Sequence, residues 1–240
     1  MPLGYSWLVP SLYLIVPAFN EARVIQTTLR NLPARIAGVD DVTVVVIDDG
    51  STDGTADEVR RTGDPRVVLL RHGINRGLGG ALGTGLAYAR RHGADFVITY
   101  DADGQHAPED IETVLRPLVE GKADAVIGSR LLDPKGMPWY RIAGNWGLNV
   151  FTYVIFGMWT TDSQSGLRGF SRTAIEQVEI RMDRMEVSSE FIKEIRRCRL
   201  RFAEVPISAI YSDYSLAKGQ RNLNAFNILI RLVLHRLMED

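Results

Sequence analysis

Short apolar runs alternate with stretches of helical periodicity over the first 130 residues of the chain. Two runs, LYLIV at 12–16 and VTVVVI at 42–47, are continuously apolar, which is typical of strands buried on both faces of a parallel sheet. Shorter strands are predicted at 67–70, 96–100 and 124–128. Helices are predicted at 21–32, 52–61 and 108–120, and a glycine-rich stretch at 75–85 leads into a helix ending near residue 92. This alternation predicts right-handed βαβ units and an α/β fold.

Polar residues follow four of these strands at the point where each strand ends. The clusters are Asn20 with Glu21, Asp48 with Asp49, the segment 101–105, and Ser129 with Arg130. Ligands of open α/β sheets bind outside the carboxyl ends of the strands, where such residues meet. The sequence therefore predicts one binding site assembled from four strand ends.

The segment FVITYDADGQH at 96–106 carries the most informative of these clusters. Asp101 and Asp103 are two residues apart, so their carboxylates lie on one side of an extended backbone and can converge on one cation. A hard divalent ion takes ligands of this kind and completes its shell with substrate phosphates. The alternative is that Asp-Ala-Asp-Gly forms an ordinary surface turn.

The stretch from 142 to 159 has 18 residues without a charge, close to the length of a membrane span. Glycines interrupt it, however, and Arg141, Asn145 and Asn149 recur every four residues, so a helix would carry them as one polar stripe. With its aromatic residues, this pattern favours an amphipathic helix at about 140–159 on a membrane surface or in a hydrophobic groove. The alternative is a helix buried in the core.

A second amphipathic helix is predicted at the C-terminal end of the chain. The chain then divides into one domain at 1–221 and a helix at 222–240. Residues 193–201 carry five basic residues and one acidic residue, which is typical of a solvated helix face, although anionic lipid headgroups would also suit them.

Composition narrows the possible classes of function. A chain of 240 residues with 45% hydrophobic and 24% charged residues is typical of one large folded domain. The net charge of −1 gives no basis for bulk electrostatic binding to nucleic acid. The single cysteine, Cys198, excludes an internal disulfide and suits a reducing compartment. No basic segment precedes the N-terminal apolar residues, so we expect no signal peptide and a cytoplasmic location.

Six motifs in a fixed order point to a protein family. They are IVPAFNE (15–21), VVVIDDGSTDGT (44–55), NRGLGGALGTG (75–85), YDADGQH (100–106), IGSR (127–130) and DSQSGLRGF (162–170). Over about residues 12–220 the chain resembles the family 2 glycosyltransferases, and among them the dolichyl- or polyprenyl-phosphate sugar synthases of the dolichol-phosphate mannosyltransferase type. The resemblance implies a GT-A fold, with a mostly parallel central sheet, helices on both faces and amphipathic membrane-facing helices.

The resemblance also implies which residues bind the donor and the metal. The donor nucleotide would contact Pro17, Ala18, Asn20, Glu21, Asp48, Asp49, Arg76, Asp101 and Ala102. A Mg²⁺ or Mn²⁺ ion would bind Asp101, Asp103 and Gln105. For Asp48 a local role in orienting the backbone is left open, and Asp53 is expected to form an Asx-turn.

On the acceptor side, the resemblance implies that a lipid phosphate binds Ser129, Arg130, Arg141 and Asn145. Asp162, Gln164 and Arg168 match a motif near the sugar and the acceptor, and the expected catalytic residues are Asp103, Arg130 and Arg141. Family members often carry Arg-x-x-Gly-Glu-Ser-Lys near the end of the catalytic domain. Here the stretch reads SDYSLAK at 212–218, which leaves Lys218 and Arg221 as possible contacts of the donor diphosphate.

The expected reaction is a metal-dependent, inverting transfer of a hexose from GDP-mannose or UDP-glucose to polyprenyl or dolichyl phosphate. The enzyme would be peripheral on the cytoplasmic face of a membrane, or held there by a small membrane protein. One alternative uses diacylglycerol or a surface glycan as acceptor, and another is a non-catalytic subunit that binds nucleotide sugar or lipid. A sugar-1-phosphate nucleotidyltransferase is disfavoured, because Pro-Ala-Phe-Asn-Glu at 17–21 replaces its Gly-rich N-terminal signature.

Overall fold

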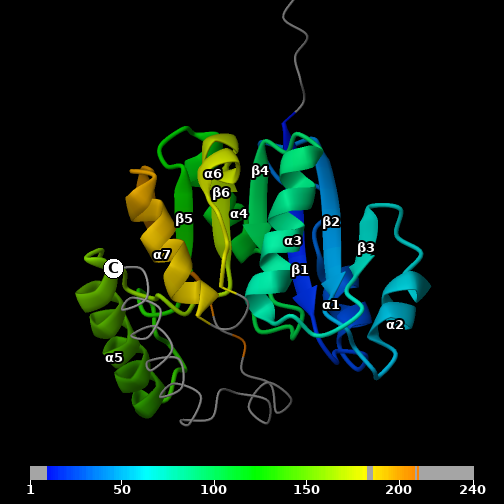
Figure 1. Ribbon diagram of the computed structural model, residues 1–240, viewed down its shortest axis with the longest axis horizontal. Helices are drawn as coiled ribbons and strands as arrows, with labels where there is room; N and C mark the ends of the chain where they lie inside the picture. Colours follow the sequence, from blue (N-terminus) through cyan, green and yellow to red (C-terminus); the bar gives the residue numbers. More distant parts are fainter. Residues whose placement is uncertain (1–9, 183–185, 209, 211–240) are drawn as a thin grey trace, which may run out of the picture.

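The fold is built on one seven-stranded sheet (Figure 1). The computed structural model describes residues 10–182, 186–208 and 210. The strands are β1 (Ser11–Ala18), β2 (Asp41–Asp48), β3 (Val67–Arg71), β4 (Phe96–Thr99), β5 (Ala125–Ser129), β6 (Arg168–Ser171) and β7 (Phe202–Pro206). Their order is β3-β2-β1-β4-β6-β5-β7, and only β6 runs antiparallel to its neighbours in this described sheet. The predicted mostly parallel α/β sheet is confirmed.

Helices cover both faces of the sheet, as predicted. They are α1 (Ile25–Asn31), α2 (Thr55–Arg61), α3 (Leu78–Arg91), α4 (Asp110–Val119), α5 (Trp139–Phe156), α6 (Arg172–Gln177) and α7 (Val187–Arg197). The helices α1, α2 and α4 form one apolar layer with Leu14, whereas α3, α6 and α7 form the other with Ile15. Successive residues of β1 thus enter opposite layers, which explains why the strand is continuously apolar.

The glycine-rich stretch at 75–85 differs from the loop that we expected to precede the helix. Helix α3 begins at Leu78, so most of these glycines are helical. A Cβ atom on Gly85 would collide with Ile15 and come within 3.0 Å of Ile47. Glycine lets the helix approach β1 and β2 closely, and this packing outweighs the poor helix propensity of glycine.

Two strands of the second half, β6 and β7, were not predicted. Because β6 runs antiparallel, its first residue Arg168 pairs with Thr99, the last residue of β4. The chain that precedes β6 therefore lies at the carboxyl ends of β4 and β5. This reversal brings residues 160–167 to the edge of the sheet where the site was predicted.

The predicted amphipathic helix is α5, which lies beside the sheet at the lower left of Figure 1 and packs against α7. Its inner face, formed by Leu148, Asn149, Thr152 and Phe156, is buried. Its other faces expose Trp139, Tyr140, Trp146, Val150, Tyr153 and Val154. The alternative of a helix buried in the core is therefore wrong. Among the described residues, no helix combines the length and the apolar character that crossing a membrane requires.

The basic run at 193–201 forms the end of α7 and the turn that follows. Arg197 Nη2 lies 2.7 Å from Glu194, and Arg201 Nε lies 2.7 Å from Asp124. The run therefore forms an ion pair within α7 and another between Arg201, just before β7, and Asp124, in addition to facing solvent. The predicted C-terminal helix, the boundary at 221, and Lys218 and Arg221 lie outside the described residues.

Candidate active site

The loops that follow β1 and β2 are tied together by hydrogen bonds. The Asn20 amide donates to Ser51 Oγ at 2.9 Å, and Asn20 Oδ1 accepts from the Thr52 amide at 3.0 Å. The Glu21 amide donates to Thr55 Oγ1 at 2.8 Å. Asn20 has a φ of 54°, a left-handed conformation that asparagine tolerates better than most residues. These contacts fix Asn20 and Glu21 where a nucleotide pocket was predicted.

The other predicted donor contacts differ in their exposure. Pro17 is partly exposed, whereas Ala18 and Ala102 are buried. The carbonyl oxygen of Ala102 accepts a hydrogen bond from Thr28 Oγ1 at 3.0 Å. Arg76 is exposed and lines a groove of about 430 Å³ between α3 and residues 178–182.

Asp49 organises the turn that leads into α3. Its Oδ1 atom accepts from the Arg76 amide at 2.9 Å and lies 2.7 Å from His72 Nδ1, and its Oδ2 atom accepts from the Gly77 amide at 2.7 Å. His72 Nε2 lies 3.0 Å from Thr84 Oγ1 in α3. The Asp49 side chain is only 5% exposed. Both carboxylate oxygens are engaged with the protein itself, which differs from the predicted contact with base or ribose.

Asp48 is fully buried and has a local role. Its Oδ1 atom accepts from the Ser51 amide at 2.9 Å, and its Oδ2 atom lies 3.1 Å from Arg71 Nε. Asp48 therefore orients the loop, the alternative left open above, and its predicted contact with the nucleotide stays a prediction. Asp53 accepts from the amides of Thr55 and Ala22, both at 3.1 Å, as expected of an Asx-turn that also joins the first loop.

Asp101 and Asp103 lie directly after β4, as predicted. Asp101 Oδ2 is 3.0 Å from Nε2 of His106, a buried residue whose carbonyl oxygen accepts from the Tyr100 hydroxyl at 2.6 Å. Asp103 accepts from the backbone amide of Gln105 at 3.0 Å and from its side-chain amide. The predicted metal-binding residues are therefore gathered in one loop.

The electrostatic environments of the two carboxylates differ. Burial raises the pKa of Asp103, and the neighbouring charge of Asp101 adds to this effect, bringing the pKa to about 6. Burial also acts to raise the pKa of Asp101, but the hydrogen bond and charge of His106 outweigh it and leave that pKa below its ordinary value. Like charges held this close favour the binding of a cation between them.

The chemistry of this loop suits a hard divalent cation. Within the described ranges, no three His, Cys, Asp or Glu side chains are placed to hold a metal by themselves. Mg²⁺, however, commonly binds proteins through one or two carboxylates and fills its shell with water and substrate phosphates. Gly166 keeps the space beside Asp101 open, because a Cβ atom there would collide with the carboxylate. Asp101 and Asp103 with Gln105 therefore fit such an ion.

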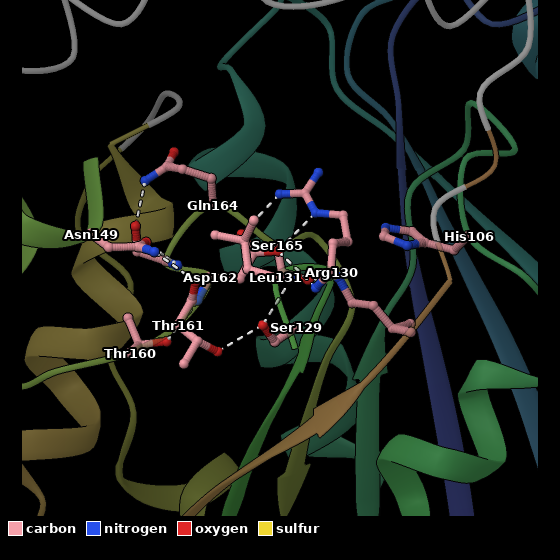
Figure 2. A network of polar contacts seen from close by, with 12 residues as sticks. His106, Ser129, Arg130, Leu131, Asn149, Thr160, Thr161, Asp162, Gln164 and Ser165 are labelled. Carbon is pink, nitrogen blue, oxygen red and sulfur yellow. Dashed lines mark hydrogen bonds and ion pairs between the residues drawn. The ribbon is translucent and has the colours of Figure 1, made fainter. Parts of the chain in front are cut away.

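Arg130, which follows β5, is held by a buried carboxylate (Figure 2). Asp162 is fully buried and accepts from the Arg130 backbone amide at 3.1 Å, from Nε at 2.8 Å and from Nη2 at 2.9 Å. The Arg130 side chain remains 21% exposed, and its charge acts on the pKa of Asp101. A fork-shaped pair of this kind fixes the orientation of the guanidinium. Arg130 thus lies near the carboxylates of the metal loop.

Ser129 supports the site from within. It is fully buried, and its Oγ atom lies 2.7 Å from Thr161 Oγ1 and accepts from the Leu131 amide at 3.3 Å. Its predicted contact with an acceptor phosphate stays a prediction.

Arg168 is also an internal residue, with 1% of its surface exposed. Its Nη2 atom donates to the carbonyl oxygen of Ser163 at 3.3 Å, and its Cζ atom lies 4.9 Å from the ring centroid of Phe191. Burial lowers its pKa to about 10, although the charges of Asp101 and Asp162 oppose this fall. Arg168 is therefore an internal counter-charge behind these carboxylates, and its predicted role near the sugar and the acceptor stays a prediction.

The remaining predicted acceptor residues are Arg141, Asn145 and Gln164, and all three are partly exposed. Arg141 and Asn145 lie one turn apart in the first half of α5. Gln164 Nε2 donates to the hydroxyl of Ser163 at 3.2 Å. Their contact with an acceptor stays a prediction.

Sequence reasoning missed several residues that support the site. His72, Gly166 and Glu204 act through contacts between distant parts of the chain. No motif or periodicity marks His72 and Glu204, and Gly166 lies in the motif at 162–170, which does not show what the glycine contacts. Asn149 did carry a signal, because it belongs to the polar stripe of α5. The stripe predicted one shared face but not what that face contacts.

A sheet of this order, with a carboxylate loop and a fixed arginine at its carboxyl edge, defines a glycosyltransferase with a GT-A fold. Comparison with known proteins identifies the family. The family model described as glycosyl transferase family 2 matches residues 13–179, and the chain belongs to this family.

Curated relatives match nearly the whole chain. An uncharacterized protein of Methanocaldococcus jannaschii is 43% identical, over 94% of this chain and 92% of its own length. The UDP-N-acetylglucosamine–dolichyl-phosphate N-acetylglucosaminyltransferase of Methanococcus voltae is 36% identical, over 94% of this chain and 96% of its own length. The undecaprenyl-phosphate mannosyltransferase of Micrococcus luteus is 30% identical, over 85% of both chains.

A solved structure agrees with the fold. It is glucosyl-3-phosphoglycerate synthase from Mycobacterium tuberculosis, in complex with Mn²⁺, UDP and glucosyl-3-phosphoglycerate. The TM-score is 0.67 over 96% of this chain and 79% of that chain, at 22% sequence identity.

Proposed function

We propose that this glycosyltransferase moves a sugar from a nucleotide-diphosphate donor to polyprenyl or dolichyl phosphate, with inversion at the anomeric carbon. The observation that carries the proposal is Arg130, fixed by Asp162 beside the carboxylates of the metal loop. An arginine fork suits the recognition of a phosphate acceptor. The relatives from Methanococcus voltae and Micrococcus luteus, whose names state lipid-phosphate acceptors, support the same choice.

The proposal includes a divalent cation held by Asp101 and Asp103, with Gln105 beside them. When bound, such an ion neutralises the charge that develops on the departing nucleotide diphosphate. The Mn²⁺ and UDP present in the glucosyl-3-phosphoglycerate synthase complex support a divalent cation and a nucleotide-diphosphate donor. Both Mg²⁺ and Mn²⁺ match the chemistry of the loop.

The acceptor explains why the site needs no strong general base. A phosphate is already anionic at neutral pH, so its oxygen can attack the anomeric carbon directly. Positioning then supplies much of the reduction of the barrier, up to about 7–11 kcal/mol in favourable cases. Arg130, with Arg141 and Asn145 at the start of α5, would hold this phosphate.

A lipid acceptor also requires contact with a membrane. The exposed aromatic and aliphatic side chains of α5 support peripheral binding to the cytoplasmic face. The single cysteine is consistent with that reducing compartment. A small membrane protein that covers the same face of α5 is the alternative attachment.

The test is a transfer assay with purified protein and polyprenyl phosphate. Radiolabelled UDP-N-acetylglucosamine, GDP-mannose and UDP-glucose are supplied separately, with Mn²⁺ or with EDTA. We expect label in the lipid phase with one donor, and its loss with EDTA and with Asp103→Asn. Diacylglycerol serves as the competing acceptor. Transfer to diacylglycerol alone would overturn the acceptor assignment, and nucleotide binding without transfer to any acceptor would favour a non-catalytic subunit.

A further inference from the structure

Asn149 is a buried polar residue that the proposed reaction leaves without a role. It lies on the inner face of α5 and is 1% exposed. A buried side-chain amide without partners would be strongly unfavourable, so its contacts show what the residue does.

Both ends of the Asn149 amide contact the loop at 160–165 (Figure 2). Nδ2 donates to the carbonyl oxygen of Thr161 at 2.6 Å, and Oδ1 accepts from the Ser163 amide at 2.9 Å. The two bonds bracket Asp162, the residue between them, whose carboxylate holds Arg130. The position of this loop therefore decides where the arginine lies.

The sheet holds the same loop from the other side. Glu204 of β7 accepts three hydrogen bonds through Oε1, from Thr160 Oγ1 at 2.7 Å, from the Thr161 amide at 2.7 Å and from Thr161 Oγ1 at 2.8 Å. The loop is thus clamped between a carboxylate of the sheet and an amide of α5.

We propose that Asn149 is a positioning residue that couples α5 to Arg130 and thereby sets the affinity for the acceptor phosphate. The inference rests on the proposed function, because Arg130 needs a phosphate partner for the coupling to affect transfer. The path consists of Asn149, the backbone of Thr161 and Ser163, the carboxylate of Asp162 and the guanidinium of Arg130. Hydrogen bonds at both ends of this path are joined by the covalent chain at 161–163, so a shift of α5 relative to the sheet moves the arginine.

The same helix connects this path to the exterior. Beside Asn149 on the same helix, α5 exposes Trp146, Val150, Tyr153 and Val154, which belong to neither apolar layer of the sheet. A membrane or a protein that contacts these exposed side chains can therefore change the geometry of Arg130 without touching it.

The test compares Asn149→Ala with Thr152→Val. Thr152 is a matched control, because it lies on the same buried face and is 1% exposed, but shares its 3.3 Å hydrogen bond with Ser189 of α7. We expect Asn149→Ala to raise the KM for a short-chain polyprenyl phosphate about tenfold, which corresponds to the loss of one to two buried hydrogen bonds. The KM for the nucleotide sugar should change less than about twofold, and Thr152→Val should leave both constants within about twofold.

Hydrogen exchange provides a second measurement that needs no turnover. Asn149→Ala should accelerate exchange at the amides of residues 161–163 and at the Arg130 amide, whereas Thr152→Val should not. Asn149→Leu keeps about the volume of the side chain and removes both hydrogen bonds without adding a charge, so it serves if the alanine variant does not fold. This variant should also raise the KM for polyprenyl phosphate, as Asn149→Ala does.

The outcomes separate this inference from the proposed function. If the wild type transfers sugar to polyprenyl phosphate and Asn149→Ala leaves the acceptor KM unchanged, the coupling is wrong. Unchanged exchange at 161–163 and Arg130 also overturns it, whether or not transfer is observed. If the wild type transfers nothing to polyprenyl phosphate, the proposed function fails and the effect on acceptor affinity fails with it. Accelerated exchange would then still support the structural link from Asn149 to Arg130.

Discussion

At the scale of single residues, the carboxylates of the site fall into two groups. Asp48, Asp49 and Asp162 are buried and accept hydrogen bonds from the protein's own groups. Asp101 and Asp103 instead lie in one short loop, and the charge of Asp101 raises the pKa of Asp103. The first group stabilises the fold, whereas the second costs stability until a cation binds.

Asp49→Asn should destabilise the protein by about 1–3 kcal/mol, because the amide nitrogen cannot accept a hydrogen bond that a carboxylate oxygen now accepts. The measurement is urea unfolding at neutral pH. Asp57→Asn is the control, since Asp57 pairs with Arg60 on the surface with its side chain 64% exposed, and it should change stability by less than about 0.5 kcal/mol. An equal effect of both variants would contradict the role of Asp49.

Asp103 should make the stability of the metal-free protein depend on pH. Its pKa of about 6 in the folded protein lies above the ordinary value of 3.8, so between these values the folded state binds more protons than the unfolded state. Stability should therefore fall as pH rises from about 4 to 6, by at most about 3 kcal/mol.

The measurement is thermal unfolding in EDTA across this pH range. Asp103→Asn should remove the fall, and Mn²⁺ added to the wild type above pH 6 should reverse it. A wild type whose stability rises through this window, in parallel with Asp103→Asn, would show that the carboxylates do not repel each other.

The residues at the strand ends were predictable from the sequence because a polar residue after a buried strand must lie at the edge of the sheet. The partner of each carboxylate was not predictable. Asp48 and Asp101 look alike in sequence, yet Asp48 contacts Ser51 and Arg71, while Asp101 contacts His106 in the predicted metal loop. The distinction depends on contacts between distant residues, which a single sequence does not show.

At the scale of elements, α3 illustrates how packing overrides local preference. Its glycines predicted a loop, but Gly85 lies against β1 and β2 where no side chain fits. The strands β1 to β5 were located because their apolar runs are long or flanked by clear turns. The strands β6 and β7 were missed, because their sequences RGFS and FAEVP contain charged and polar residues in place of an apolar run.

Two glycine substitutions in α3 should have opposite effects. Gly85→Ala should lower stability by about 1–3 kcal/mol, because the added methyl group collides with Ile15. Gly83→Ala places its methyl group 3.6 Å from Ile180, an ordinary contact, and should raise stability by up to about 1 kcal/mol through helix propensity. Urea midpoints of the two variants measure the difference. A stabilising Gly85→Ala would contradict the close approach of α3 to the sheet.

At the scale of the whole molecule, the exposed apolar side chains of α5 lie away from the sheet and its two packed layers. Val154 is 73% exposed, and Trp139 is 79% exposed. If this face meets a membrane, a charge placed on it should weaken the contact.

Val154→Asp should reduce binding to vesicles that contain anionic phospholipid by about tenfold, because an apolar contact is replaced by a charge that must be desolvated. Ile74→Asp is the control, since Ile74 is 75% exposed in the turn before α3 and carries a side chain of similar character. Co-sedimentation measures both variants. Equal losses, or a wild type that does not bind vesicles, would contradict a membrane contact through α5.

The reversal of β6 gives the chain a modular layout. The segment that contains α5 leaves from β5 and returns into β6, and these strands are neighbours in the sheet. An insertion whose two ends are fixed side by side can change in length or sequence without shifting the register of the strands around it. Transplanting this segment between homologues would therefore test whether it sets acceptor preference, while strands β1 to β4 stay intact.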